Sequence, residues 1–130
     1  MNSEKIKSAN AARLSKVNPL LAEKCRTIIQ LAERESFTLI VTCGFRSNEE
    51  QNRLYQIGRR GIAGEKKVTN AQGGQSNHNH GSAVDFAFVV GGEISWDDKL
   101  YQNIGRWAKQ VGLNWGGNWK SFKDFPHVEL

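Results

Sequence analysis

The residues of this chain that could do chemistry are concentrated in two short segments. All three histidines lie there together with several acids. These residues are His78, His80 and Asp85 in segment 76–85, and Asp124, His127 and Glu129 in segment 124–129. A lone histidine is more often structural than a ligand. Imidazoles grouped with carboxylates, however, are donors that zinc prefers in proteins, so the clustering favours a metal site.

Asp85 strengthens this interpretation because it interrupts an apolar stretch, Ala83 to Val90. Burying even a neutral polar group without a partner costs on the order of 2–7 kcal/mol, so this carboxylate needs a cation. An ion pair with Lys or Arg is the alternative to a metal. Two imidazoles and one carboxylate would leave one position of a tetrahedral zinc open for water, as in catalytic sites. The residues alone do not rank His78 above His80.

A hydrolytic zinc site also needs a carboxylate that accepts a proton from water. Asp124 is our candidate because it lies three residues before His127. The alternative for Asp124 is an exposed acid beside Lys123. Glu129 competes for the role, since alternation in an extended segment places its side chain on the same face as that of His127.

Arg46 follows a predicted strand and precedes a predicted helix. Functional groups commonly gather at such junctions. A guanidinium there could bind a substrate carboxylate or a developing oxyanion, and a solvated loop arginine is the alternative.

The elements that must position these residues follow from hydrophobic periodicity and from capping signals. We expect helices from Asn18-Pro19 to about Glu35, Ser47 to Ile57, and Asp97 to Gly112. We expect strands at Phe37–Cys43, Ala83–Val90, Glu93–Trp96, Leu113–Trp115 and His127–Leu130, and a long loop at Arg59–Asn77. This order predicts an α+β fold with about three helices and a small, mostly antiparallel sheet.

Composition limits the remaining possibilities. The 130 residues predict one domain. The net charge of +5 allows an anionic partner, but the basic residues are scattered, so nucleic-acid binding would rest on charge alone. No apolar run is long enough to span a bilayer, and the charged residues in Met1 to Lys16 do not read as a secretory signal. Cys25 and Cys43 read as reduced core residues.

Three motifs in order along residues 17–130 resemble the zinc peptidases of the D-alanyl-D-alanine carboxypeptidase and L-alanyl-D-glutamate peptidase family, relatives of the lysostaphin and hedgehog folds. The motifs are Gly44-Phe45-Arg46-Ser47 with Glu50-Gln51 and Leu54-Tyr55, then Ser76-x-His78-x-x-Gly81-x-Ala83-x-Asp85, and finally Asp124-x-x-His127-x-Glu129.

The resemblance implies a role for each matching residue. It implies a single catalytic zinc ion held by His78, Asp85 and His127, and it makes His80 a non-ligand. It also implies Asp124 as the catalytic base and Arg46 as an oxyanion or substrate binder. Gln51 and Ser76 are the further substrate-binding residues that we expect from it.

The chain has Asp124 where members that cleave D-Ala-D-Ala usually carry Glu, and this is similar to phage L-alanyl-D-glutamate endolysins. Trp115-Gly116-Gly117-x-Trp119 is a further similarity, with core packing as the alternative for the tryptophans. The resemblance implies a monomeric endolysin with one catalytic domain and no separate cell-wall-binding domain. It would be made in the host cytoplasm, reach periplasmic peptidoglycan with the help of a holin, and lyse the cell. The alternatives are a D-alanyl-D-alanine carboxypeptidase and a non-catalytic peptidoglycan-binding domain.

Overall fold

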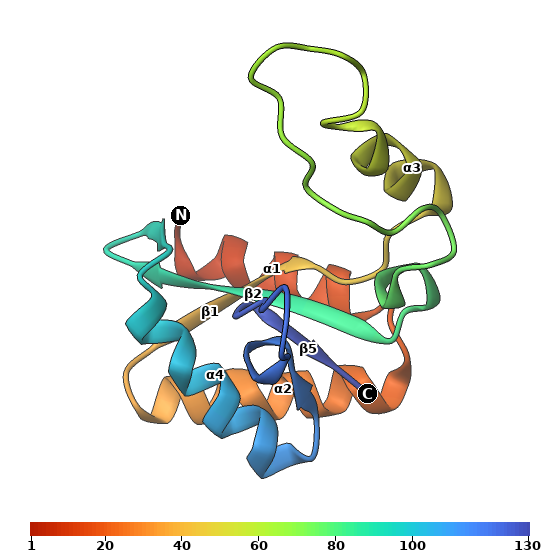
Figure 1. Ribbon diagram of the computed structural model, residues 1–130. Helices are drawn as coiled ribbons and strands as arrows, with labels where there is room; N and C mark the ends of the chain where they lie inside the picture. The colour runs from red at the N-terminus through yellow and green to blue at the C-terminus, as the bar shows by residue number, and fades with distance from the viewer.

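The computed structural model describes residues 1–130 and arranges them around one antiparallel sheet (Figure 1). The helices are α1 Ser3–Leu14, α2 Pro19–Arg34, α3 Asn48–Gln56 and α4 Asp98–Val111, with 3₁₀ turns η1 Asn77–His80 and η2 Gly116–Asn118. The strands are β1 Thr38–Cys43, β2 Ala83–Val90, β3 Glu93–Ser95, β4 Asn114–Trp115 and β5 His127–Glu129.

The five strands pair in the order β1-β2-β5-β4, with β3 also pairing with β2, and every pairing is antiparallel. The predicted α+β class and antiparallel sheet are confirmed. Beyond the three helices predicted, the structure has a further one, α1. Its buried residues Ile6, Asn10 and Leu14 are spaced at helical intervals, but the polar middle residue interrupts the apolar stripe. None of the four helices is long and apolar enough to cross a bilayer.

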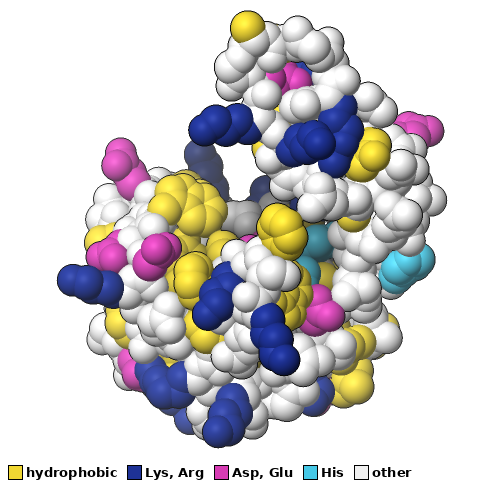
Figure 2. Space-filling model, viewed as in Figure 1, with side chains coloured by type: hydrophobic (Ala, Val, Ile, Leu, Met, Phe, Trp, Pro, Cys, Tyr) yellow, Lys and Arg dark blue, Asp and Glu magenta, His cyan; other side chains and the backbone are white.

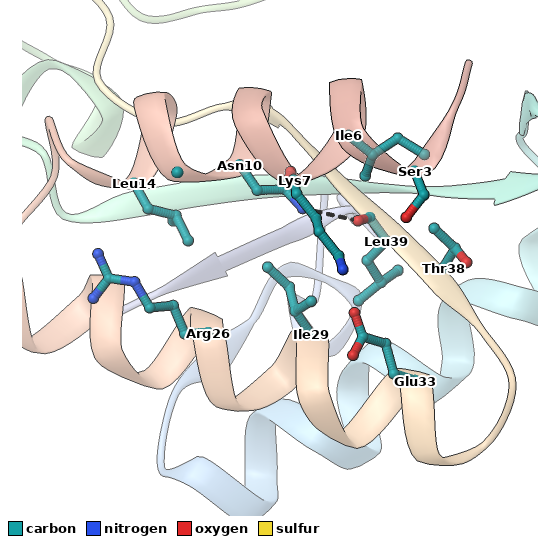
Figure 3. A pocket seen from close by; sticks show the side chains of 11 residues that line it. Ser3, Ile6, Lys7, Asn10, Leu14, Arg26, Ile29, Glu33, Thr38 and Leu39 are labelled. Atoms are coloured by element: carbon teal, nitrogen blue, oxygen red, sulfur yellow. Dashed lines mark hydrogen bonds between the residues drawn. The ribbon is translucent and has the colours of Figure 1, made fainter.

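Helix α1 covers the free edge of β1. The Asn10 amide donates to the Leu39 carbonyl at 3.1 Å, and its Oδ1 accepts from the Val41 N–H at 2.7 Å. These bonds satisfy edge groups that would otherwise be open to another strand. Figure 3 shows the Asn10–Leu39 bond in a cavity of about 250 Å³ between α1, α2 and β1, which contains none of the predicted site residues.

The main core lies on one face of the sheet, against α2 and α4. Helix α2 begins as predicted, with the Asn18 side chain accepting from the Leu20 N–H at 2.8 Å and Pro19 in the first turn. Its apolar stripe is buried: Leu21, Cys25, Ile28 and Ala32. Helix α4 likewise begins after Asp97 and ends at Gly112, whose left-handed backbone closes the helix.

Strand alternation directs the chemistry-bearing side chains to the face opposite this core. In β2, Val84 and Phe86 belong to the main core cluster, so Asp85 between them points the other way. In β5, Val128 packs into the same core, so His127 and Glu129 also point to the opposite face. Two strands that are distant in sequence therefore present polar groups on one side of the sheet.

Helix α3 and the loop that follows it form a lobe that projects from the sheet in Figure 1. The Ser47 side chain caps α3 by accepting from the Glu50 N–H at 3.1 Å. The Glu50 side chain forms an ion pair with Arg53. The loop up to η1 has no regular structure, as predicted, and the fully buried Gln51 anchors it by donating to the Ala71 carbonyl at 2.7 Å.

Candidate metal centre

Sheet register brings three candidate donors into one row across adjacent strands. Cys43 of β1 is paired with Asp85 of β2, which is paired in turn with His127 of β5. The pairing of β1 with β2 is irregular between Val41 and Cys43. This bulge inserts Thr42 and places Cys43 opposite Asp85, and bulges commonly redirect side chains beside functional sites.

His78 completes the cluster from the η1 turn that precedes β2. Asp85 Oδ1 lies 3.2 Å from His78 Nε2 and 3.0 Å from His127 Nδ1. Bond lengths to zinc near 2 Å separate tetrahedral ligands by about 3.3 Å, so both spacings and the N/N/O donor set fit zinc. Figure 2 shows histidine side chains recessed between the lobe and the body of the molecule. Both imidazoles are almost fully buried.

In each imidazole, the far nitrogen, which points away from Asp85, has its own partner. His78 Nδ1 lies 2.8 Å from the Gly44 carbonyl oxygen, and His127 Nε2 lies 2.6 Å from Glu129 Oε1. A carbonyl or carboxylate can only accept, so each of these far nitrogens carries a proton, and the near nitrogen that faces Asp85 is the one that can give up its proton to bind a metal. This arrangement is the usual outer support of metal-ligating histidines.

Glu129 is therefore a support for His127 and lies on the side away from Asp85. Its second oxygen, Oε2, accepts from Asn77 Nδ2 at 2.9 Å. With both oxygens bonded, this carboxylate is fixed against the ring. The two acids that residue spacing alone did not separate, Glu129 and Asp124, have different surroundings.

Asp124 lies on the side of His127 that faces Asp85. Its Oδ2 is 3.8 Å from His127 Nδ1, and its side chain is 43% exposed. Asp124 also forms a group of possible metal donors with Asp85 and His127, whose donor atoms lie within 4.8 Å of one another. Gly116 packs under it, because a Cβ there would lie 2.3 Å from the Asp124 carbonyl oxygen.

The protonation equilibria follow from this crowding. Burial favours the neutral form of Asp85, but hydrogen bonds from His127 and His78 outweigh burial and lower the Asp85 pKa. Burial likewise opposes charging of His78, yet hydrogen bonds to Asp85 and Cys43 raise its pKa to about 10. The Asp124 pKa is raised, first by burial and then by the charge of Asp85.

His78, Asp85, Asp124 and His127 line a cavity with a volume of about 620 Å³. Arg46 lines this cavity as well. Its guanidinium donates to Gln51 Oε1 at 2.9 Å and to Cys43 Sγ at 3.2 Å. Gln51 itself is completely buried, so it can act on the cavity only indirectly, by positioning Arg46 and the loop at Ala71. Ser76 lines the cavity and caps η1, its hydroxyl accepting from the His78 N–H at 3.2 Å.

Cys43 corrects one expectation from the sequence. Cys25 is fully buried as predicted, but Cys43 is only half-buried, and its Sγ lies 3.5 Å from His78 Nδ1. The interpretation of Cys43 as a core residue is therefore wrong. No local spacing signals this contact, because strand pairing and η1 create it.

The tryptophans and the third histidine occupy different environments. Trp115 is buried and donates to the Phe125 carbonyl at 2.7 Å, which is a packing role. The Trp119 ring lies 5.0 Å from the His127 ring and lines the cavity. His80 is exposed, with Nε2 2.8 Å from the Gly74 carbonyl oxygen. Trp119 and Asn77 are site residues to which the sequence assigned no role.

Known proteins resemble this chain over most of its length. Residues 14–122 match the family described as VanY, D-alanyl-D-alanine carboxypeptidase. The chain is 38% identical over 129 residues to the peptidoglycan L-alanyl-D-glutamate endopeptidase CwlK of Bacillus subtilis, with 89% of this chain and 74% of the relative covered. It is 25% identical over 127 residues to the L-alanyl-D-glutamate peptidase of Listeria phage A118; that match covers 95% of this chain but only 41% of the phage protein.

Solved structures extend the similarity. The L-Ala D-Glu endopeptidase ChiX of Serratia marcescens superposes with a TM-score of 0.68 at 30% identity, covering 94% of this chain and 86% of ChiX. The vancomycin-resistance D,D-pentapeptidase VanY, solved with Zn(II), also gives 0.68 but at 16% identity, covering 87% of this chain and 71% of VanY. The second likeness shows the fold alone. Because the family match spans residues 14–122 and the Bacillus relative is 38% identical with 74% of its length covered, this chain belongs to the D-alanyl-D-alanine carboxypeptidase (VanY) family of peptidases.

Proposed function

We propose that this chain is a zinc-dependent endopeptidase that hydrolyses the L-alanyl-D-glutamate bond of peptidoglycan stem peptides. The observation that carries the proposal is the pair of buried imidazoles on one Asp85 oxygen, with Asp124 beside them on the cavity side. CwlK, ChiX and the phage relative, each named for activity on this bond, support the choice of substrate.

His78, Asp85 and His127 are the residues that would hold zinc. A bound zinc ion supplies Lewis acidity toward a carbonyl and makes hydroxide available near neutral pH. The protein's part is to present two neutral imidazoles and one carboxylate. The Gly44 carbonyl and Glu129 do this by fixing the ring tautomers.

Asp124 would take a proton from the attacking water at one carboxylate oxygen and deliver it to the leaving amine. A general base works best when its pKa approaches the working pH, and burial moves the Asp124 pKa in that direction. Arg46 would stabilise negative charge on the scissile carbonyl oxygen, since Gln51 and Cys43 hold its guanidinium at the cavity wall.

Digestion of purified sacculi followed by mass analysis tests the bond. We expect stem peptides that have lost only L-Ala and begin with D-Glu. Release of terminal D-Ala would overturn the proposal in favour of a D-alanyl-D-alanine carboxypeptidase, the activity in the family's description. Absence of any cleavage by zinc-loaded protein would favour a non-catalytic peptidoglycan-binding domain.

An Asp124→Asn variant tests the assignment of the base. We expect the rate to fall by about 10²–10⁴-fold, the usual contribution of general acid–base catalysis. The zinc content should stay that of the unchanged protein, because the three proposed ligands are intact. A variant that retained full activity would show that Asp124 is not the base.

A finer proposal is that the chain acts as a monomeric phage endolysin on periplasmic peptidoglycan after release through a holin. The Listeria phage relative supports this role. Co-expression with and without a holin in a Gram-negative host tests it. Lysis that needs the holin is the expected result, and lysis without one would contradict the release route.

A further inference from the structure

A second cavity opens beside the metal-site cavity, and the two share the lining residues Val68, Thr69, Ala71, Gln75 and Asp124. Its volume is about 780 Å³. One wall is the loop segment 67–71, and Phe122 contributes to the lining together with Asp124. Because Asp124 lines both cavities, a peptide cleaved at the metal site would extend into this space.

The loop wall is held in place by contacts at its base. Gly58 packs against the backbone of Lys67, where a Cβ on Gly58 would lie 2.2 Å from the Lys67 nitrogen. Buried Gln51 donates to the Ala71 carbonyl at 2.7 Å, and Thr69 Oγ1 accepts from the Ala71 N–H at 3.1 Å. The wall is thus tied to the helix that carries Gln51.

Phe122 is the unusual feature of the lining. Its side chain is 82% exposed, and its backbone has a φ of +53°. A bulky residue in the left-handed region costs about 1–2 kcal/mol, and an exposed ring recovers none of this by packing. Strained residues of this kind cluster at ligand-binding sites.

Charge indicates what the cavity would accept. Lys67 is the only basic residue in its lining, and Asp124, at the border with the metal site, is the only acid. Val68 is exposed on the same wall. The cavity therefore offers one cation together with the apolar Val68, Ala71 and Phe122, which suits a carboxylate that has methylene groups beside it. Figure 2 shows Lys and Arg side chains on the lobe around the hollow.

The proposed substrate has such a group. Glutamate carries two carboxyl groups, and the stem peptide uses only one of them for its next bond. The other remains a free carboxylate a few bonds from the leaving nitrogen. We infer that this cavity binds the glutamyl residue on the leaving side of the cleaved bond, an inference that rests on the proposed function. Lys67 pairs with the free carboxylate of that residue, and Phe122 and Val68 contact its methylene groups.

A matched pair of peptide substrates tests this assignment. One peptide contains the Ala–Glu bond with the free carboxylate, and the other carries an amide in its place. We expect the wild type to prefer the acid by about fivefold in kcat/KM at low ionic strength, the scale of a partly exposed ion pair, mainly through KM. Added salt should reduce this preference.

The enzyme variants form the other side of the test. Lys67→Met should cleave both peptides equally well, whereas Lys66→Met, an exposed lysine outside the cavity lining, should keep the wild-type preference. A preference for the acid retained in Lys67→Met, or absent from the wild type, would overturn the proposed role of this cavity and leave the proposed function standing. If the wild type cleaves neither peptide, the proposed function itself fails.

A Phe122→Ala variant tests the apolar contact separately. We expect kcat/KM to fall about threefold or more for both peptides, on the scale of one partly buried side chain, with the acid-to-amide ratio unchanged. Equal activity of this variant and the wild type would remove Phe122 from the proposed site.

Discussion

Glu129→Gln changes one charge beside the metal centre while nearly preserving the size of the side chain. In the structure Glu129 Oε1 accepts from His127 Nε2 at 2.6 Å, and Oε2 accepts from Asn77 Nδ2 at 2.9 Å. A glutamine can keep the first bond through its single oxygen. The Asn77 side chain is exposed, so its amide can turn to meet the new NH₂ group. The main loss is therefore the negative charge.

The size of the effect follows from the kind of hydrogen bond that is lost. A bond to a charged group contributes about 1.5–3 kcal/mol and a neutral one about 0.5–1.5 kcal/mol. The Glu129 side chain is only 19% exposed, so water screens the charge little. The difference of about 1–1.5 kcal/mol predicts roughly tenfold weaker zinc binding. Glu129→Ala should approach the 100-fold limit typical of outer-shell changes.

Zinc affinity is measured by competition with a chromogenic chelator at several pH values. Comparing the pH values separates two effects of the substitution on zinc affinity. One is the loss of the negative charge, and the other is competition between zinc and a proton for His127. Glu93→Gln is the control, because it removes an exposed strand carboxylate elsewhere in the protein. Wild-type zinc affinity in Glu129→Gln across this pH range would refute the reasoning, and wild-type melting of the zinc-free variant would exclude misfolding as the cause of a loss.

Two further predictions concern stability. Gly105→Ala should lower the free energy of unfolding by about 1–3 kcal/mol in urea titrations, since its Cβ would lie 2.4 Å from the Trp115 ring; an unchanged midpoint would show that this ring can move freely. In zinc-free protein the His78 pKa is raised to about 10, as bonding to Asp85 outweighs burial. This stabilisation is complete below pH 6.5 and is lost as the pH rises toward 10. The free energy of unfolding should therefore decline from pH 6.5 to 8.5. The measurement stops there because the Cys25 thiol ionises in the unfolded chain near pH 9.0. Stability that is constant or rises over this range would contradict the assignment.

Local signals were sufficient for most of the fold. The Asn18-Pro19 start of α2, the strands β2 and β3 and the Gly112 end of α4 are encoded by neighbouring residues, and the structure confirms them. Helix α1 was missed because its central buried residue, Asn10, is polar. Only contact with the backbone of β1 explains why an amide is buried there.

The sequence by itself determined which residue types could form the site. A carboxylate within the apolar stretch of β2 and histidines confined to two segments indicated a metal site, and the three motifs indicated the family. Alternation in β2 and β5 then requires Asp85 and His127 to lie on the face opposite the core. These conclusions depend on local periodicity, which a sequence displays directly.

Only the tertiary structure decided which nitrogen of each imidazole faces Asp85, which acid lies on the Asp85 side of His127, and that Cys43 contacts His78. The physical reason is that these contacts arise from cross-strand register and from a bulge in β1. Register joins residues that are far apart in the chain, and a slip of one position would reverse every side chain.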